Sequence, residues 1–234
     1  MLSHTTNFSR TQSLSKSPSL GKNPRFVPPA ASHSLNGTLD MMGVPMSFAR
    51  NSEIYGENEP AEFVYKLVSG AVRTSKILND GRRQIGEFYL PGDIFGLDVG
   101  TEHAFSAEAI ADAKVLVIKR SAVEALAARD NDVARQLWAT TGRELQRMQE
   151  HILLLIKTAQ ERVAGFLLEM AMRIKSNTEI ELPMSRQDIA DYLGLTIETV
   201  SRTLTILENS AAIALPSSRR IVLRNPAALR RLNG

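Results

Sequence analysis

Short β-prone segments separated by glycines fill the first half of the chain. Seven of the fourteen glycines lie between Gly56 and Gly100, and the segments between them are rich in Val, Ile, Phe and Tyr. Many short strands joined by tight turns are typical of an antiparallel barrel or jelly roll. The pattern predicts a hairpin turn at Asn79-Asp80-Gly81 and strands at 62–68, 71–78, 83–88 and 114–119.

A narrow apolar stripe with helical spacing follows this region. Its six positions recur at intervals of three and four residues in a polar segment: Trp138, Thr141, Leu145, Met148, Ile152 and Leu155. This spacing is that of the a and d positions of a coiled coil. The stripe can pack on the chain's own β domain or on a second copy, and its narrowness favours the second. We therefore expect a dimerisation helix over 131–157, with these six residues, here called the seam, at a homodimer interface.

Capping signals predict where neighbouring helices begin. Ser121 with Glu124 has the spacing of a capping box for a short helix that closes the β domain, and Thr158 with Glu161 has it for a longer helix. These signals predict a β domain at 41–130 and a C-terminal domain at 158–234.

Residues 185–208 have the pattern of a helix-turn-helix. Ser185 with Asp188 predicts the start of a first helix, Gly194 provides the turn, and Thr196 caps a second helix. At helical spacing, one face of the second helix is apolar: Val200, Leu204 and Leu207. The opposite face holds hydrogen-bonding side chains, with Ser201 on its flank: Glu198, Arg202 and Thr205.

This polar face has the chemistry needed to contact DNA bases. Arg202 can donate two hydrogen bonds to guanine, and Glu198 can accept one from cytosine, so the two can recognise one G·C pair. The alternative is an ordinary intrahelical ion pair between Glu198 and Arg202. Residues 213–223 favour the DNA interpretation, because two β-prone segments around a Pro-Ser-Ser turn occupy the position of a wing. From Ser185 onward the chain has seven arginines, no lysine and four acidic residues, a composition suited to phosphate contacts.

Composition excludes several other classes of protein. The chain has 234 residues, a net charge of +3 and no cysteine, so disulfides, thiolate metal sites and thiol nucleophiles are excluded. The β region has one histidine, too few for a metal-binding cupin enzyme. The longest aliphatic run, Ile152–Ile156, is too short to cross a membrane. We expect a cytoplasmic, non-enzymatic protein without metal or cofactor, and the arginine-rich wing argues against a pure protein-interaction module.

Residues 1–40 differ in composition from the rest. They contain eight serines, four prolines and one acidic residue, Asp40. Such a segment cannot bury much apolar surface, so a disordered tail is expected. An organelle transit peptide is less consistent with the sequence, because the basic residues lack amphipathic spacing.

Together, the glycine-rich β region, the long seam helix and the segment Ile197-Glu198-Thr199-Val200-Ser201-Arg202 resemble the CRP/FNR superfamily of bacterial transcription regulators over about residues 50–234. The recognition segment is similar to that of the FNR and FixK branches, because it has serine where CRP has glycine. The resemblance implies an α+β fold: an N-terminal jelly roll (double-stranded β-helix) of the cyclic-nucleotide-binding type, a dimerisation helix and a C-terminal winged helix-turn-helix.

The same resemblance implies a function. We expect a homodimeric activator that binds palindromic double-stranded DNA with TTGA-like half-sites and works with RNA polymerase on genes of microaerobic respiration, nitrogen fixation or denitrification. Base contacts are expected from four residues of the second helix: Ile197, Glu198, Ser201 and Arg202. Phosphate contacts are expected from five residues: Ser185, Arg186, Thr199, Arg219 and Arg220. FixK-type relatives can have a redox-active cysteine at the position of Ser185, and serine lacks that chemistry.

The ligand motifs of the superfamily are altered in this chain. In the stretch that matches the cyclic AMP cassette, 92–107, Leu97 replaces the expected glutamate and Phe105 replaces the phosphate-binding arginine. An unpaired buried phosphate is costly, so no cyclic nucleotide is expected. His103, a haem-ligand candidate, is expected instead to be a solvated loop residue. A regulator gated by an unrecognised effector in the barrel remains the alternative.

Overall fold

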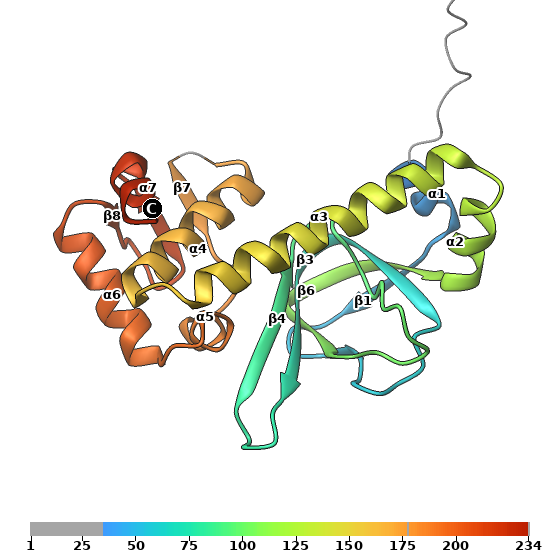
Figure 1. Ribbon diagram of the computed structural model, residues 1–234, viewed down its shortest axis with the longest axis horizontal. Coiled ribbons are helices and arrows are strands. Elements are labelled where there is room, and N and C mark those ends of the chain that lie inside the picture. Colours follow the sequence, from blue (N-terminus) through green and yellow to red (C-terminus); the bar gives the residue numbers. More distant parts are fainter. Residues whose placement is uncertain (1–34, 177, 234) are drawn as a thin grey trace, which may run out of the picture. The chain divides into compact units, whose positions relative to one another are not determined.

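The structure is a computed structural model that describes residues 35–176 and 178–233 (Figure 1). Helix α1 (Leu35–Met42) precedes six strands: β1 (Val44–Phe48), β2 (Glu53–Tyr55), β3 (Phe63–Ile77), β4 (Arg83–Tyr89), β5 (Ile94–Phe95) and β6 (Ser106–Lys119). The sheet has the order β1-β6-β3-β4, while β2 also pairs with β6 and β5 with β3, and every pairing is antiparallel. The expected jelly-roll domain is therefore confirmed.

The strands are longer and more numerous than the pattern predicts. β3 is one strand rather than two, because Gly70 adopts φ +88° and lets the backbones of β3 and β6 approach closely. A Cβ atom at this position would lie 2.3 Å from the Asp112 carbonyl oxygen. β6 begins at Ser106, well before the predicted position 114, because its alanine-rich first half is held by pairing with β3.

Two predictions near the ends of the β domain are corrected. Leu35 and Leu39 of α1 are buried against Val64 and Val133, so the expected disordered tail does not include residues 35–40. The remainder of that prediction, residues 1–34, lies outside the described residues. The Ser121 capping box is also wrong: α2 (Arg120–Ala127) has Lys119 as its N-cap residue, two residues earlier than predicted, without a side-chain cap. Glu124 instead accepts a hydrogen bond from Arg120 Nε at 3.0 Å.

The predicted dimerisation helix is α3 (Asn131–Leu155), a single helix of 25 residues that Figure 1 shows passing beside the β domain. Asp130 caps its start by accepting hydrogen bonds from the Asp132 and Val133 N–H groups. The Tyr89 hydroxyl of β4 donates to Glu144 at 3.0 Å, which ties the helix to the barrel.

The remaining elements form the C-terminal domain: α4 (Ala159–Ile174), β7 (Glu179–Glu181), α5 (Arg186–Leu193), α6 (Ile197–Asn209), β8 (Ile213–Ala214), β9 (Arg220–Leu223) and α7 (Pro226–Asn233). The capping box of Thr158 with Glu161 is confirmed at the start of α4. The wing is a sheet of order β7-β9-β8, and β7 is a strand that the sequence pattern does not predict. The core of this domain is continuous with Ala71, Ile85 and Phe88 of the barrel.

Candidate nucleic-acid interface

Helices α5 and α6 form the predicted helix-turn-helix. Ser185 and Asp188 form a reciprocal capping box at the start of α5, and Gly194 ends the helix at φ +61°. The Thr196 hydroxyl caps α6 by accepting from the Thr199 N–H at 3.2 Å. The buried side chains of α6 include the three that the pattern predicts, Val200, Leu204 and Leu207, together with Thr203.

The opposite face of α6 is open to solvent. Glu198, Arg202 and Thr205 are exposed, and Ile197 beside them is 37% exposed. Hydrogen bonds from the Glu198 N–H and from the Thr196 hydroxyl hold the pKa of the Glu198 carboxyl below its usual range, so it is ionised near neutral pH. Among the described residues, no ion pair joins Glu198 to Arg202. The intrahelical alternative is therefore not what the structure has, and both groups face solvent as acceptor and donor.

Arg186 joins the two helices of the motif. Its Nη1 donates to the Ser201 hydroxyl at 3.3 Å, so a predicted phosphate contact of α5 lies against a predicted base contact of α6. Ser185, at the N-terminus of α5, is half-buried. The Thr199 hydroxyl lies 3.1 Å from that of Thr196. The structure thus brings Arg186 of α5 and Ser201 of α6 together, whereas Thr199 lies beside the cap of α6.

The turn of the motif accepts hydrogen bonds from a residue outside the motif, which the sequence pattern does not predict. Arg162 of α4 donates to the carbonyl oxygens of Leu193 and Gly194, at 2.9 and 3.4 Å. These carbonyls end α5 and have no partner within the helix, so the guanidinium satisfies them. No local motif marks Arg162, because the contact spans about thirty residues of sequence.

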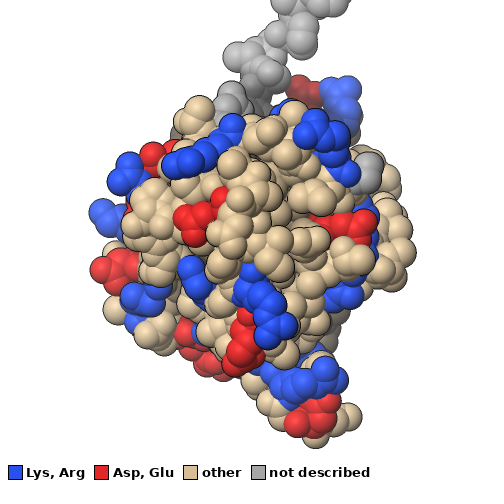
Figure 2. All heavy atoms as spheres, turned by 90° about the vertical axis from the view of Figure 1, so that its left-hand side faces the viewer, with Lys and Arg blue, Asp and Glu red and all other residues tan. Residues whose placement is uncertain are grey.

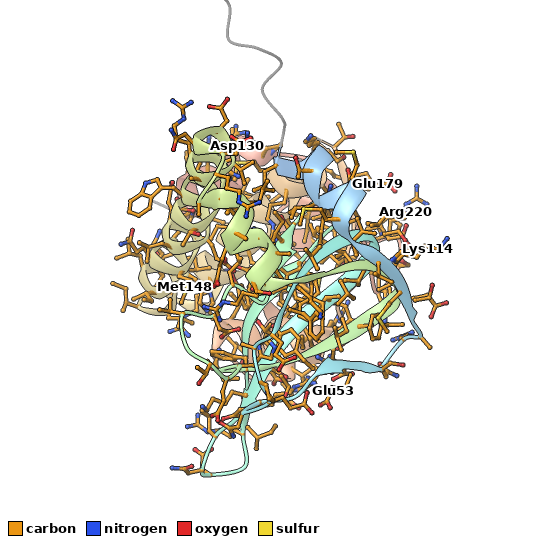
Figure 3. All side chains as sticks on the ribbon, turned by 90° about the vertical axis from the view of Figure 1, so that its right-hand side faces the viewer. Glu53, Lys114, Asp130, Met148, Glu179 and Arg220 are labelled. Atoms are coloured by element: carbon orange, nitrogen blue, oxygen red, sulfur yellow. The ribbon has the colours of Figure 1, made fainter. Side chains whose placement is uncertain are left out.

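The two wing arginines differ in their surroundings. Arg219 is half-buried, and its carbonyl accepts from the Leu182 N–H at 2.8 Å. Arg220 is exposed and forms an ion pair with Glu179 of β7, and Figure 3 shows the two residues beside each other. Figure 2 views the side of the molecule on which α6, β8 and α7 lie, where Lys and Arg side chains are spread across the face with acidic side chains between them. Positive charge on this face is therefore interrupted by negative charge and does not form one continuous patch.

The seam of α3 is largely uncovered in the single chain. Trp138 is 82% exposed, Ile152 is 61% exposed, and only Leu155 of the six seam residues is half-buried. Figure 3 shows Met148 at the outer margin of the helix. The chain's own β domain does not cover the seam.

The interior of the β domain is filled by aromatic rings. Tyr55 stacks on His103 with ring centroids 3.6 Å apart, and Tyr65 and Phe95 are buried beside them. The expectation that His103 is solvated is wrong: it is 2% exposed, and its Nδ1 lies 2.8 Å from Asp98 Oδ2. The loop folds inward because this ring completes the aromatic cluster.

The described residues contain no cluster of three or more His, Cys, Asp or Glu side chains suited to a metal ion. None of the described helices is both long and apolar enough to cross a bilayer.

The arrangement of a jelly roll, a long helix and a winged helix-turn-helix defines a class of DNA-binding regulator. Two family models match the chain: a cyclic nucleotide-binding domain at residues 45–130 and a Crp-like helix-turn-helix domain at residues 161–232.

Similar proteins indicate to which branch of this class of regulators the chain belongs. The chain is 56% identical to the nitrogen fixation regulation protein FixK of Azorhizobium caulinodans, over 82% of this chain and 80% of that protein. It is 41% identical to FixK of Rhizobium meliloti, over 77% and 82% of the two chains. The solved structure of FixK2 from Bradyrhizobium japonicum is similar with a TM-score of 0.79 and 53% identity, over 82% of this chain and 98% of that one. The chain belongs to the CRP/FNR superfamily of transcription regulators, in its FixK-type branch, and is a DNA-binding transcription activator.

Proposed function

We propose that the protein binds palindromic operators with TTGA-like half-sites as a homodimer, without a small effector, and activates genes of microaerobic respiration, nitrogen fixation or denitrification through RNA polymerase. The observation that carries the proposal is the exposed face of α6, where Glu198 and Arg202 are not paired to each other. In the major groove, Arg202 would donate to guanine O6 and N7, and Glu198 would accept from an amino group of cytosine or adenine.

The homodimer is supported by the exposed seam. An apolar stripe on a solvent-facing helix is stabilised when a second copy covers it, and side chains at a and d positions then interdigitate. A two-fold axis along α3 would present two α6 helices to successive major grooves, about 34 Å apart. The operator is therefore expected to contain two inverted half-sites about one helical turn apart.

Phosphate contacts would orient each half of the dimer. Ser185 caps the start of α5, Arg186 is the first residue of that helix, and the positive end of the α5 dipole favours an anion beside them. Thr199 lies in the first turn of α6 and would add a third contact. In the wing, Arg219 and Arg220 would add contacts, although Arg220 must first exchange its Glu179 partner for a phosphate.

Independence of cyclic nucleotides is supported by the barrel itself. Leu97 and Phe105 stand where the superfamily has its glutamate and its phosphate-binding arginine, and Ser106 already accepts a hydrogen bond from the Glu57 N–H at 2.9 Å. One observation favours the alternative of an unrecognised effector: His103 Nε2 is buried without a hydrogen-bond partner among the described residues. A thermal-shift screen separates the two, since a saturating ligand raises the melting temperature.

Fluorescence anisotropy tests the proposal directly. The purified protein is titrated, without effector, into a labelled duplex with two inverted TTGA-like half-sites and into a scrambled duplex of the same composition. We expect selective binding of the palindrome, and an unchanged Kd when millimolar cyclic AMP is added. Equal affinity for both duplexes would contradict the proposed specificity, and a tenfold tighter Kd with cyclic AMP, about 1.4 kcal/mol, would contradict effector independence.

A further inference from the structure

The first helix of the DNA-binding motif is held by two arginines of the β domain. Asp188 Oδ1 accepts hydrogen bonds from Arg73 Nη1 of β3 at 2.5 Å and from Arg83 Nη2 of β4 at 2.8 Å. The other oxygen, Oδ2, accepts from the N–H and the hydroxyl of Ser185, at 2.9 and 2.8 Å. One carboxylate therefore joins the barrel to Ser185, the N-cap residue of α5.

A second carboxylate on the same helix strengthens the contact. Asp191 lies three residues further along α5, and its Oδ2 accepts a hydrogen bond from Arg83 Nε at 2.8 Å. Arg83 Nη2 also lies 2.7 Å from this oxygen, within ion-pair distance. The planar guanidinium of Arg83 thus spans two carboxylates, a geometry that a lysine cannot reproduce. Arg73 is fixed from its other side by Glu108 of β6 at 2.8 Å.

Burial makes this contact consequential. Asp188 is 4% exposed, and the side chains of Arg73 and Arg83 are 11% and 25% exposed. A buried carboxylate that loses one of its partners keeps its desolvation cost, so such pairs are strongly coupled. Apolar packing holds the same contact, because Phe88 of β4 lies against Tyr192 of α5 with ring centroids 5.1 Å apart.

We propose that Arg73 and Arg83 are positioning residues for DNA binding, which act through Asp188 and Asp191. These four residues, here called the latch, fix the N-terminus of α5 where Ser185 is to meet the DNA backbone. The arginines also neutralise a carboxylate that would otherwise repel a phosphate at that place. The proposal rests on the proposed function in one respect, the phosphate contact of Ser185.

A matched pair of variants in one hairpin tests the latch. Arg83→Gln removes the charge that spans Asp188 and Asp191. Arg82→Gln makes the same chemical change one residue away, where the Arg82 side chain is 78% exposed and, among the described residues, forms an ion pair with Asp80 of the turn. In anisotropy titrations of the full chain, Arg83→Gln should raise the operator Kd about tenfold, and Arg82→Gln should leave it within about twofold.

A double-mutant cycle distinguishes positioning from a general loss of stability. If Arg83 acts through Asp191, Asp191→Asn should also weaken operator binding. The double variant, Arg83→Gln with Asp191→Asn, should then have about the same operator Kd as the single variant that binds the operator more weakly. Circular dichroism at the assay temperature verifies that each variant is folded. Where Arg83→Gln does not fold, the Kd of Asp191→Asn, a change of charge with little change of shape, decides the question.

The outcomes separate the latch from the proposed function. A wild-type protein that fails to prefer the palindrome contradicts the proposed function before any variant is measured. If the wild type prefers the palindrome but a folded Arg83→Gln or Asp191→Asn variant has an unchanged operator Kd, the latch is overturned and the proposed function stands. Additive losses in the cycle overturn it as well, because the two residues would then act independently.

Discussion

Single side chains of α6 and of the wing are expected to make different kinds of DNA contact. Arg202 is exposed on the face that would enter the major groove, whereas Arg219 belongs to the wing beside it. Contacts to base edges distinguish sequences, and contacts to phosphates bind all sequences alike. The two arginines therefore differ in what their loss should do.

Arg202→Ala should weaken binding to the operator by about 1–3 kcal/mol per half-site and change binding to a scrambled duplex little, because a base contact is lost. Arg219→Ala is the matched control and should weaken both duplexes alike. It should also reduce the slope of log Kd against log salt by about one. Anisotropy at several salt concentrations measures both effects. Equal losses for Arg202→Ala on both duplexes would identify Arg202 as a phosphate contact instead.

Two glycines with positive φ should respond very differently to alanine. Gly70→Ala places a Cβ 2.3 Å from the Asp112 carbonyl oxygen, so the backbones of β3 and β6 must separate, and we expect a loss above about 3 kcal/mol. Gly194→Ala meets nothing closer than Arg162 Nη1 at 3.6 Å. Only the left-handed conformation is then penalised, by about 1–2 kcal/mol. Urea unfolding of both variants gives the comparison, and equal losses would show that the sheet adapts.

At the scale of elements, the exposed seam of α3 is expected to be required for the chain to dimerise. Ile152→Lys places a charge in the middle of the exposed apolar stripe, so it should yield monomers with weak operator binding. Gln146→Lys adds the same charge off the seam, where Gln146 bonds to Glu150 at 2.8 Å, and should leave the assembly unchanged. Sedimentation velocity at micromolar concentration measures both. A monodisperse monomer from the unaltered protein would refute the dimer.

The elements differ in how far the sequence could predict them. The caps of α4, α5 and α6 depend on residues three apart, so local spacing predicts them, and all three are present. β1 and the first half of β6 have weak local signals, because Pro45 and a run of alternating alanines disfavour strands in isolation. Pairing with distant partners stabilises both. The contact between Arg73 and Asp188 spans 115 residues, and no local pattern encodes it.

At the scale of the whole molecule, a buried group of charges joins the barrel to α3 and α4. Arg173 of α4 donates to Glu87 of β4 and Glu169 of its own helix, at 2.9 and 3.3 Å. It also pairs with Asp93 at 2.9 Å, and Arg147 of α3 lies 3.7 Å from that carboxylate. Three carboxylates, those of Glu87, Asp93 and Glu169, thus share the guanidiniums of Arg147 and Arg173. The net charge of this buried group therefore changes when one carboxylate gains a proton.

Stability should therefore depend on pH through Glu169. Burial and the nearby Glu87 raise the pKa of the Glu169 carboxyl to about 7, against the opposing effect of Arg173. In the unfolded chain the pKa of this carboxyl is about 4.5, so the folded state binds more protons between these two values. The free energy of unfolding should then fall as the pH rises from about 4.5 to about 7, by at most about 1.36 kcal/mol per pH unit from this group.

Glu169→Gln removes this titration and keeps an acceptor for Arg173. The advantage of the variant over the wild type in free energy of unfolding should grow as the pH rises through that window and become constant above it. Urea titrations at several pH values between about 5 and 8 measure the difference. Parallel pH profiles would show that Glu169 titrates normally in the folded protein.

The seam also provides a built-in spectroscopic probe. Trp138 is the single tryptophan of the chain, and it is 82% exposed on α3. Its emission maximum should shift to shorter wavelength when a second copy excludes water from the indole ring. The maximum should shift back to longer wavelength as dilution separates the two copies. A dilution series of the unlabelled protein, read at two wavelengths of the tryptophan emission, would thus report the strength of self-association at one known position.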